Sequence, residues 1–209
     1  TGNGSAIYAR NLVLNGVQVV NNGIEGVISS IYGGAVYFSY NLSMINSYVS
    51  SNYAQGTSDS NALDIKSAGV ASAAAEVEVN ITNSTIANNI IQNLSTAQNN
   101  PGVATTSGSQ LWVYGGDVDI SNSLIEANSE DEIAINQRIL DKNFGDNVTR
   151  IASTAKFTLS GNVQIIGKLQ LTRIDGNSVE DVDKDSNLKL SSISANSVIN
   201  LALDLDGEG

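Results

Sequence analysis

Apolar and polar residues alternate along most of this chain, in short stretches separated by asparagine, serine and glycine. The clearest stretch is Gly33–Asn52, with the sequence GGAVYFSYNLSMINSYVSSN. Side chains of a strand point alternately to opposite faces, so a period of two predicts short β-strands with one apolar face. Asparagine and glycine tolerate positive φ and are typical of the turns between strands. The pattern therefore predicts an all-β protein.

Three other stretches copy Gly33–Asn52 in the same order, namely Gly4–Asn22, Ser60–Asn89 and Gly108–Asn128. Each opens with small residues and closes with valine or isoleucine three positions before an asparagine. The closing apolar residues lie 30, 37 and 39 positions apart, at Val19, Val49, Ile86 and Ile125. An ordered recurrence predicts a repeat architecture, with about three strands and three corners in each repeat. Gly26–Ile31 supplies the third strand of the first repeat.

The fold that satisfies this recurrence is a right-handed parallel β-helix of about six to eight coils. Regular coils are expected over residues 4–128 and less regular coils over 129–209, in one segment of a longer surface protein. We expect the closing apolar residues to stack in one inward ladder. The corner asparagines should stack in a second ladder, as amides do in cross-β assemblies: Asn22, Asn52, Asn89 and Asn128. An antiparallel sandwich or barrel also suits short strands, but it does not explain the ordered recurrence.

Insertions and later elements complete this prediction. Lys66–Ala75 and Asn99–Ser107 are expected to be surface loops, because insertions in stacked repeats usually lie on one face. Ile133–Ile135 is predicted as a strand, although a capping box before it leaves a short helix over 130–142 as the alternative. Ala155–Ile166 is predicted as strand, turn and strand.

Charge and composition exclude several functions. The 209 residues carry a formal net charge of −11 with ten basic residues, which disfavours nucleic acid and anionic lipid as partners. Cysteine and histidine are both absent, so the chain has no disulfide, thiolate zinc site or imidazole base. No apolar run is long enough to cross a bilayer, so we expect no direct membrane insertion of this segment.

The opening Gly33–Val36 and the closing pattern apolar-x-x-Asn resemble the paired GGA(I/L/V) and FxxN repeats of chlamydial polymorphic outer-membrane proteins. Similar repeats occur in large bacterial adhesins and in autotransporter passengers, and Phe157–Leu171 is similar to adhesin-like proteins of Gram-positive gut bacteria. Only Gly33–Val36 matches the first motif in full, and valine or isoleucine replaces the phenylalanine of the second. The resemblance covers roughly residues 4–128. It implies a right-handed parallel β-helix, an extracellular or cell-surface location, and adhesion without catalytic residues.

Aromatic residues recur beside the inward residue that opens each repeat. If Ile7, Val36, Leu63 and Leu111 point inward, their neighbours must point outward. This outward row is Tyr8, Tyr37, Asp64 and Trp112, with Tyr114 two positions further along. We predict that Tyr8, Tyr37, Trp112 and Tyr114 form a recognition strip for a glycan or a host-surface protein. The alternative is that Tyr8 and Tyr37 stack on each other and only stabilise the sheet.

An acidic segment near the end of the chain carries oxygen ligands at every second position: Asp181, Asp183, Asp185 and Asn187. This spacing resembles the start of an EF-hand loop, so calcium is the one cofactor that the sequence suggests. The segment departs from that motif at Ser186, where the loop needs glycine, and at Ser192, where it needs a bidentate glutamate. A solvated acidic loop is the alternative.

Three functions remain open. The first is a non-enzymatic extracellular adhesin or passenger segment that binds a host-surface protein or glycan. The second is the subunit of an extracellular fibre or sheath, with copies of itself as partners. The third is a polysaccharide-active β-helix enzyme, for which the chain offers one weak acidic patch on adjacent coils: Glu76, Glu78, Asp117 and Asp119.

Overall fold

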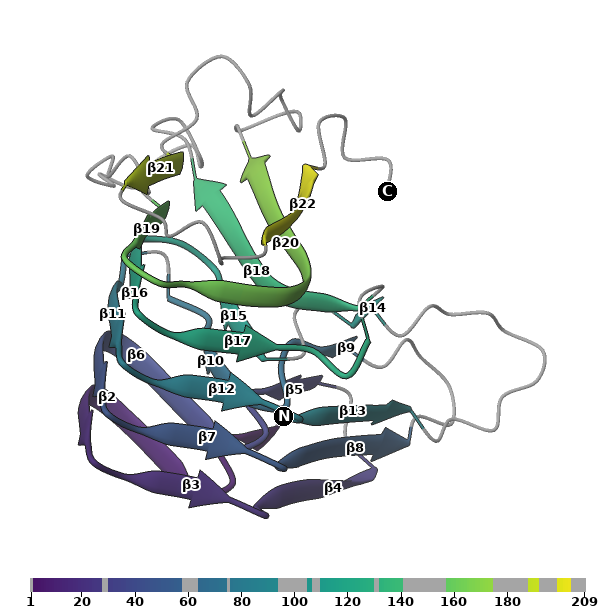
Figure 1. Ribbon diagram of the computed structural model, residues 1–209. Coiled ribbons are helices and arrows are strands. Elements are labelled where there is room, and N and C mark those ends of the chain that lie inside the picture. Colours follow the sequence, from purple (N-terminus) through teal and green to yellow (C-terminus); the bar gives the residue numbers. More distant parts are fainter. Residues whose placement is uncertain are drawn as a thin grey trace, which may run out of the picture.

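The computed structural model describes residues 2–27, 30–57, 64–74, 76–93, 105–106, 110–129, 132–140, 157–174, 188–191 and 199–203. Its elements are all β-strands, arranged in sheets of 4, 15 and 3 strands (Figure 1). Every pairing between these strands is parallel. The prediction of an all-β chain is confirmed, and the antiparallel alternative is wrong for the described strands.

The two smaller sheets are made of short strands. The 4-stranded sheet contains β1 (Gly2–Asn3), β5 (Ser30–Tyr32), β9 (Asp64–Ile65) and β14 (Thr105–Thr106). The 3-stranded sheet contains β4 (Gly23–Val27), β8 (Tyr53–Thr57) and β13 (Ile90–Asn93).

The 15-stranded sheet bends around the core in two parts. One part holds β2 (Ile7–Asn15), β6 (Val36–Ile45), β10 (Val70–Ser72), β11 (Glu78–Thr82), β15 (Leu111–Val113), β16 (Asp117–Ser121), β18 (Ile133–Leu140), β19 (Phe157–Ser160) and β21 (Leu188–Ser191). The other holds β3 (Gln18–Val20), β7 (Tyr48–Ser50), β12 (Thr85–Ala87), β17 (Leu124–Glu126) and the start of β20 (Gln164–Ile174). From Lys168 on, β20 pairs with β18 of the first part and with β22 (Ile199–Leu203).

Strands from successive repeats lie directly above one another, as β3, β7, β12 and β17 do in Figure 1. The closing apolar residues therefore fall in one register, which confirms the predicted inward ladder and extends it by one repeat: Val19, Val49, Ile86, Ile125 and Ile165. All five side chains are buried in a single aliphatic core. Stacking explains the burial, because each short strand has its apolar face covered by the strands around it.

The same backbone geometry recurs at two corners from one repeat to the next. At the corner before β3, β7, β12 and β17, φ is positive at equivalent positions, with values of 66°, 49°, 48° and 48° at Gly16, Asn46, Asn83 and Asn122. At the next corner, φ is 57°, 56° and 56° at Asn21, Ser51 and Asn88. Asparagine is the non-glycine residue that most readily adopts this left-handed conformation. Asparagine thus forms the first corner in three of these four repeats. At the second corner, the turn residue directly precedes the asparagine of the predicted ladder.

Buried amide side chains connect the repeats at the second corner. The backbone N–H and Nδ2 of Asn22 donate to Oδ1 of Asn52 at 2.9 and 3.1 Å, and those of Asn52 donate to Oδ1 of Asn89 at 3.1 and 2.8 Å. The fourth position is taken by Gln110, whose Oε1 accepts the same pair of bonds from Asn89 at 3.1 and 2.7 Å. Asn128 is exposed instead and donates to the Asn89 carbonyl at 3.0 Å. The asparagine ladder is therefore confirmed for three residues and wrong for Asn128.

Serine hydroxyls connect the repeats at the first corner. The backbone N–H groups of Val17, Ser47 and Ser84 donate to Oγ of the serine in the following repeat, at 3.1, 3.1 and 3.0 Å. Each serine hydroxyl in turn donates to the carbonyl two residues earlier: Ser47 to Ile45, Ser84 to Thr82 and Ser123 to Ser121. Each backbone donor at this corner therefore has a partner in the next repeat.

Several boundaries differ from those predicted. Lys66–Ala75, expected to be a loop, contains β10, which pairs with β6 and β15 in the large sheet. One strand was expected over Gly26–Ile31, but the structure has β4, which pairs with β8, and β5, which pairs with β1 and so opens the second repeat. Ile133–Ile135 belongs to β18, so the helical alternative is wrong there. The strand, turn and strand of Ala155–Ile166 is confirmed as β19, a corner at Gly161 and the start of β20.

Candidate functional site

The aromatic residues beside the opening positions form one row across parallel strands. Tyr8 pairs with Tyr37, Tyr37 with Ala71, and Ala71 with Trp112. The Tyr8 and Tyr37 rings stack with centroids 5.2 Å apart and planes 14° apart. Asp64 is not in this row, because β9 belongs to the 4-stranded sheet and Ala71 takes the position expected for it. The prediction that Asp64 is the third member of this row is therefore wrong.

This row points away from the aliphatic core but is largely covered. Tyr8 is 65% exposed, whereas Tyr37 is 8% and Trp112 only 1% exposed. Tyr32, Tyr114 and Lys66 cover Trp112. The centroids of the Tyr32 and Tyr114 rings lie 5.8 and 6.1 Å from the centroid of the Trp112 ring, and the Lys66 ammonium lies 5.5 Å from it. The expectation that the Tyr37 and Trp112 side chains are exposed is therefore wrong. Ligand binding at this row stays a prediction.

The covered row behaves as a second, aromatic core. Burial raises the pKa of the Tyr37 hydroxyl, and a hydrogen bond with the Ala73 backbone offsets part of this rise. The indole N–H of Trp112 and Oδ1 of its register neighbour Asn136 are buried without a hydrogen-bond partner. Indole and amide groups in such surroundings stabilise less than paired ones, because burial removes their bonds to water.

The proposed calcium ligands Asp181, Asp183, Asp185 and Asn187 lie outside the residues that the structure describes. Within the described ranges, no group of three or more acidic, histidine or cysteine side chains is arranged to hold a metal ion. The calcium site stays a prediction.

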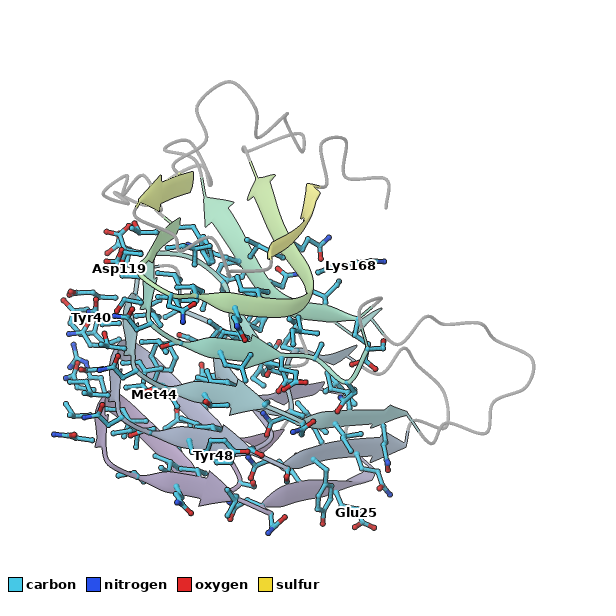
Figure 2. The ribbon with its side chains drawn as sticks, in the orientation of Figure 1. Glu25, Tyr40, Met44, Tyr48, Asp119 and Lys168 are labelled. Atoms are coloured by element: carbon cyan, nitrogen blue, oxygen red, sulfur yellow. The ribbon has the colours of Figure 1, made fainter. Side chains whose placement is uncertain are left out.

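A separate hollow of about 210 Å³ opens on the outer side of the large sheet. We call it the acidic hollow, and it is lined by Tyr40, Asn41, Glu76, Val77, Glu78, Gly116 and Asp117. Asn41, Glu78 and Asp117 are register neighbours on three adjacent strands, β6, β11 and β16. Neighbouring strands lie about 4.8 Å apart, so the two carboxylates are held side by side. In Figure 2, Tyr40 and Asp119 project from the same side of the molecule.

Backbone irregularities produce the hollow. Between the paired positions Ala9–Phe38 and Asn11–Asn41, β2 has one residue and β6 has two, so the strands form a bulge at Ser39 and Tyr40. A bulge redirects side chains, and Tyr40 is 46% exposed although strict alternation with Phe38 and Leu42 places it inward. Arg10, opposite the bulge, lies over the Tyr40 ring at 5.4 Å from its centroid.

Gly116 forms part of the wall of the acidic hollow, with φ of 91°. A Cβ atom at this position would lie 2.1 Å from the carbonyl oxygen of Val77 and 2.3 Å from its nitrogen. Only glycine fits both this φ and this close approach. The backbone of one repeat therefore packs directly against the next at the hollow.

Glu76 and Glu78 were expected on one strand face, and Asp117 and Asp119 on the same face of the adjacent coil. The structure confirms the neighbouring positions of Glu78 and Asp117. It brings Glu76, Glu78 and Asp117 to one hollow, while Asp119 pairs with Asn80 one step further along. Tyr40 and Asn41 were missed, because alternation carries no signal for a bulge.

Comparisons with protein-family models, curated proteins and solved structures found no match for this chain. Among the described residues, the structure contains no helix with the length and apolar character of a membrane span.

Proposed function

We propose that the chain is a right-handed parallel β-helix and that it serves as a rigid, non-enzymatic binding segment of an extracellular attachment protein. The observation that carries this proposal is the set of three ladders, of aliphatic, amide and serine side chains, that connect successive repeats. These ladders hold the outward residues of neighbouring repeats at fixed positions. A surface that is already ordered loses little entropy when a partner binds, which favours recognition.

The acidic hollow is the surface feature through which we propose that this segment binds. It combines exposed carboxylates, an exposed tyrosine and an amide on strands whose register is set by the ladders. Aromatic and polar groups that converge in a concave site are the usual features of recognition sites. The resemblance to adhesin repeats agrees with this role.

Binding of the purified chain to cells and extracellular matrix proteins tests this proposal. We expect a monomer by light scattering, saturable binding, and loss of that binding for the double variant Glu76→Gln/Glu78→Gln with an unchanged circular dichroism spectrum. A monomer that binds no cell, matrix protein or glycan would overturn the proposal. Release of reducing ends from polysaccharides would indicate the enzyme instead.

A fibre subunit is the second candidate. Strand β2 pairs with β6 through one edge, and among the described strands none pairs with its other edge. An unpaired edge can accept a strand from another chain. Concentration-dependent filaments in negative-stain images would support this candidate, and a monomer at all concentrations would contradict it.

A further inference from the structure

The lining of the acidic hollow is complementary to a positively charged group. Glu76 and Glu78 are exposed at its rim, and Asp117 is half-buried beside Glu78 on the adjacent strand. Carboxylates accept charge-assisted hydrogen bonds from ammonium and guanidinium groups, and these bonds are stronger than neutral ones. The amide of Asn41, at the same register position on β6, supplies a neutral acceptor beside them.

One residue that lines the acidic hollow, Tyr40, already contacts a positively charged side chain of the same chain. The guanidinium carbon of Arg10 lies 5.4 Å from the centroid of the Tyr40 ring, within the range of a cation–π contact. Tyr40 thus holds a cation of its own chain against its ring while it also lines the hollow. A tyrosine face and two or three carboxylates form an environment in which a second organic cation is stabilised both by the ring and by charge.

The size of the hollow limits what can enter it. Its volume of about 210 Å³ is below the 300–1,000 Å³ that is typical of sites for small molecules. It suits one long side chain with its charged end, and lysine and arginine both place a flexible apolar stem behind such an end. The apolar Val77 and the ring of Tyr40 would contact that stem.

We propose that the acidic hollow binds the ammonium or guanidinium end of a lysine or arginine side chain from a partner protein. This inference rests on the proposed function and names the chemistry of the partner. The formal net charge of −11 favours the approach of a basic segment over longer distances, because opposite charge accelerates association. The hollow then fixes one side chain of that segment.

The test uses the whole chain and two acetylated, amidated nonapeptides that are identical except for three lysines in one and three glutamines in the other. Affinity is measured by calorimetry at low salt. Glu76→Gln, Glu78→Gln and Tyr40→Leu should each weaken binding of the lysine peptide by about two- to fivefold, the effect expected for partly exposed charge pairs and cation–π contacts. Glu25→Gln is the matched control, because Glu25 is an exposed acid on the far side of the molecule from Tyr40 (Figure 2).

Several results would overturn the proposal. Equal weakening by Glu25→Gln would mean that only net charge attracts the peptide, and equal binding of the glutamine peptide would mean that charge plays no part. Binding of spermine or of calcium at the hollow, with no binding of the lysine peptide, would assign it to a small polyamine or a metal ion. If the chain binds cells and the Glu76 and Glu78 variants bind them equally well, this inference and the assignment of binding to the acidic hollow both fail, while the attachment function stands.

Discussion

Removing one buried amide from the asparagine ladder should destabilise the protein strongly. Oδ1 of Asn89 accepts from the backbone and side-chain nitrogens of Asn52 at 3.1 and 2.8 Å. Its Nδ2 donates to the Val49 carbonyl at 3.1 Å and to Oε1 of Gln110 at 2.7 Å. Asn89→Ala removes these four bonds, and a buried hydrogen bond contributes about 1 kcal/mol net. We therefore expect the free energy of unfolding to fall by about 4 kcal/mol.

Guanidinium denaturation followed by Trp112 fluorescence measures this change. Trp112 lies two residues after Gln110, the ladder member that follows Asn89, so its emission reports unfolding of the adjacent repeat. The control is Asn80→Ala, because the Asn80 amide donates only to Glu78, at 3.1 Å on the exposed face. We expect this control to change the free energy of unfolding by no more than about 0.5 kcal/mol.

The ladder also predicts coupling between its members. The double variant Asn52→Ala/Asn89→Ala should lose less stability than the sum of the two single variants, because both remove the same contact between the amides. Groups that share a hydrogen-bond network typically couple by about 0.5–3 kcal/mol. Equal denaturation midpoints for Asn89→Ala and Asn80→Ala, or strictly additive losses in the cycle, would refute the argument that the buried amides hold the repeats together.

Four further outcomes follow from the packing. Ile86→Ala should cost about 2–5 kcal/mol in urea denaturation, since it empties a buried position in the middle of the aliphatic ladder. Gly116→Ala should lower the melting temperature, whereas Gly16→Asn should leave it almost unchanged, because a Cβ at Gly16 meets no atom within 4 Å and asparagine adopts its φ in later repeats. Iodide should quench Trp112 emission only weakly in the folded protein; strong quenching would mean that the ring is accessible. The pKa of Tyr37 is raised above 10.0, so the stability from its neutral buried hydroxyl is complete below pH 10 and lost as pH rises through the folded-state pKa. Tyr37→Phe should therefore resist unfolding above pH 10 better than the unchanged chain, as denaturation midpoints measured against pH would show.

The sequence alone predicted the elements that depend on local patterns. Alternation placed Val19, Val49, Ile86 and Ile125 in one inward register, because a strand has only two faces. Recurring asparagines marked the corners, because few other residues adopt positive φ at low cost. Both signals come from the residue and its immediate neighbours, so they are readable without the fold.

Only the tertiary structure determines which of two similar stretches takes a given position in the fold. Asp64, expected in the opening strand, lies in the 4-stranded sheet, and Val70–Ser72, from the expected loop, takes the corresponding place in the large sheet. Likewise, Gln110 and Asn128 both end in an amide and both contact Asn89. Only Gln110 accepts from the Asn89 side chain and so continues the ladder, whereas Asn128 donates to the Asn89 carbonyl. Local pattern cannot choose between such candidates, since the choice depends on which one the previous repeat contacts.

Exposure and the acidic hollow also depended on the tertiary structure. Alternation correctly turned Tyr37 and Trp112 away from the aliphatic core. It could not show that Tyr32, from another sheet, and Lys66, just after β9, would lie against Trp112. The hollow arises where a bulge turns Tyr40 outward and carboxylates on two adjacent strands meet. A sequence pattern states which face of its own strand a residue occupies. What lies against that face is determined by residues about thirty to forty positions away, which only stacking of the repeats brings into contact.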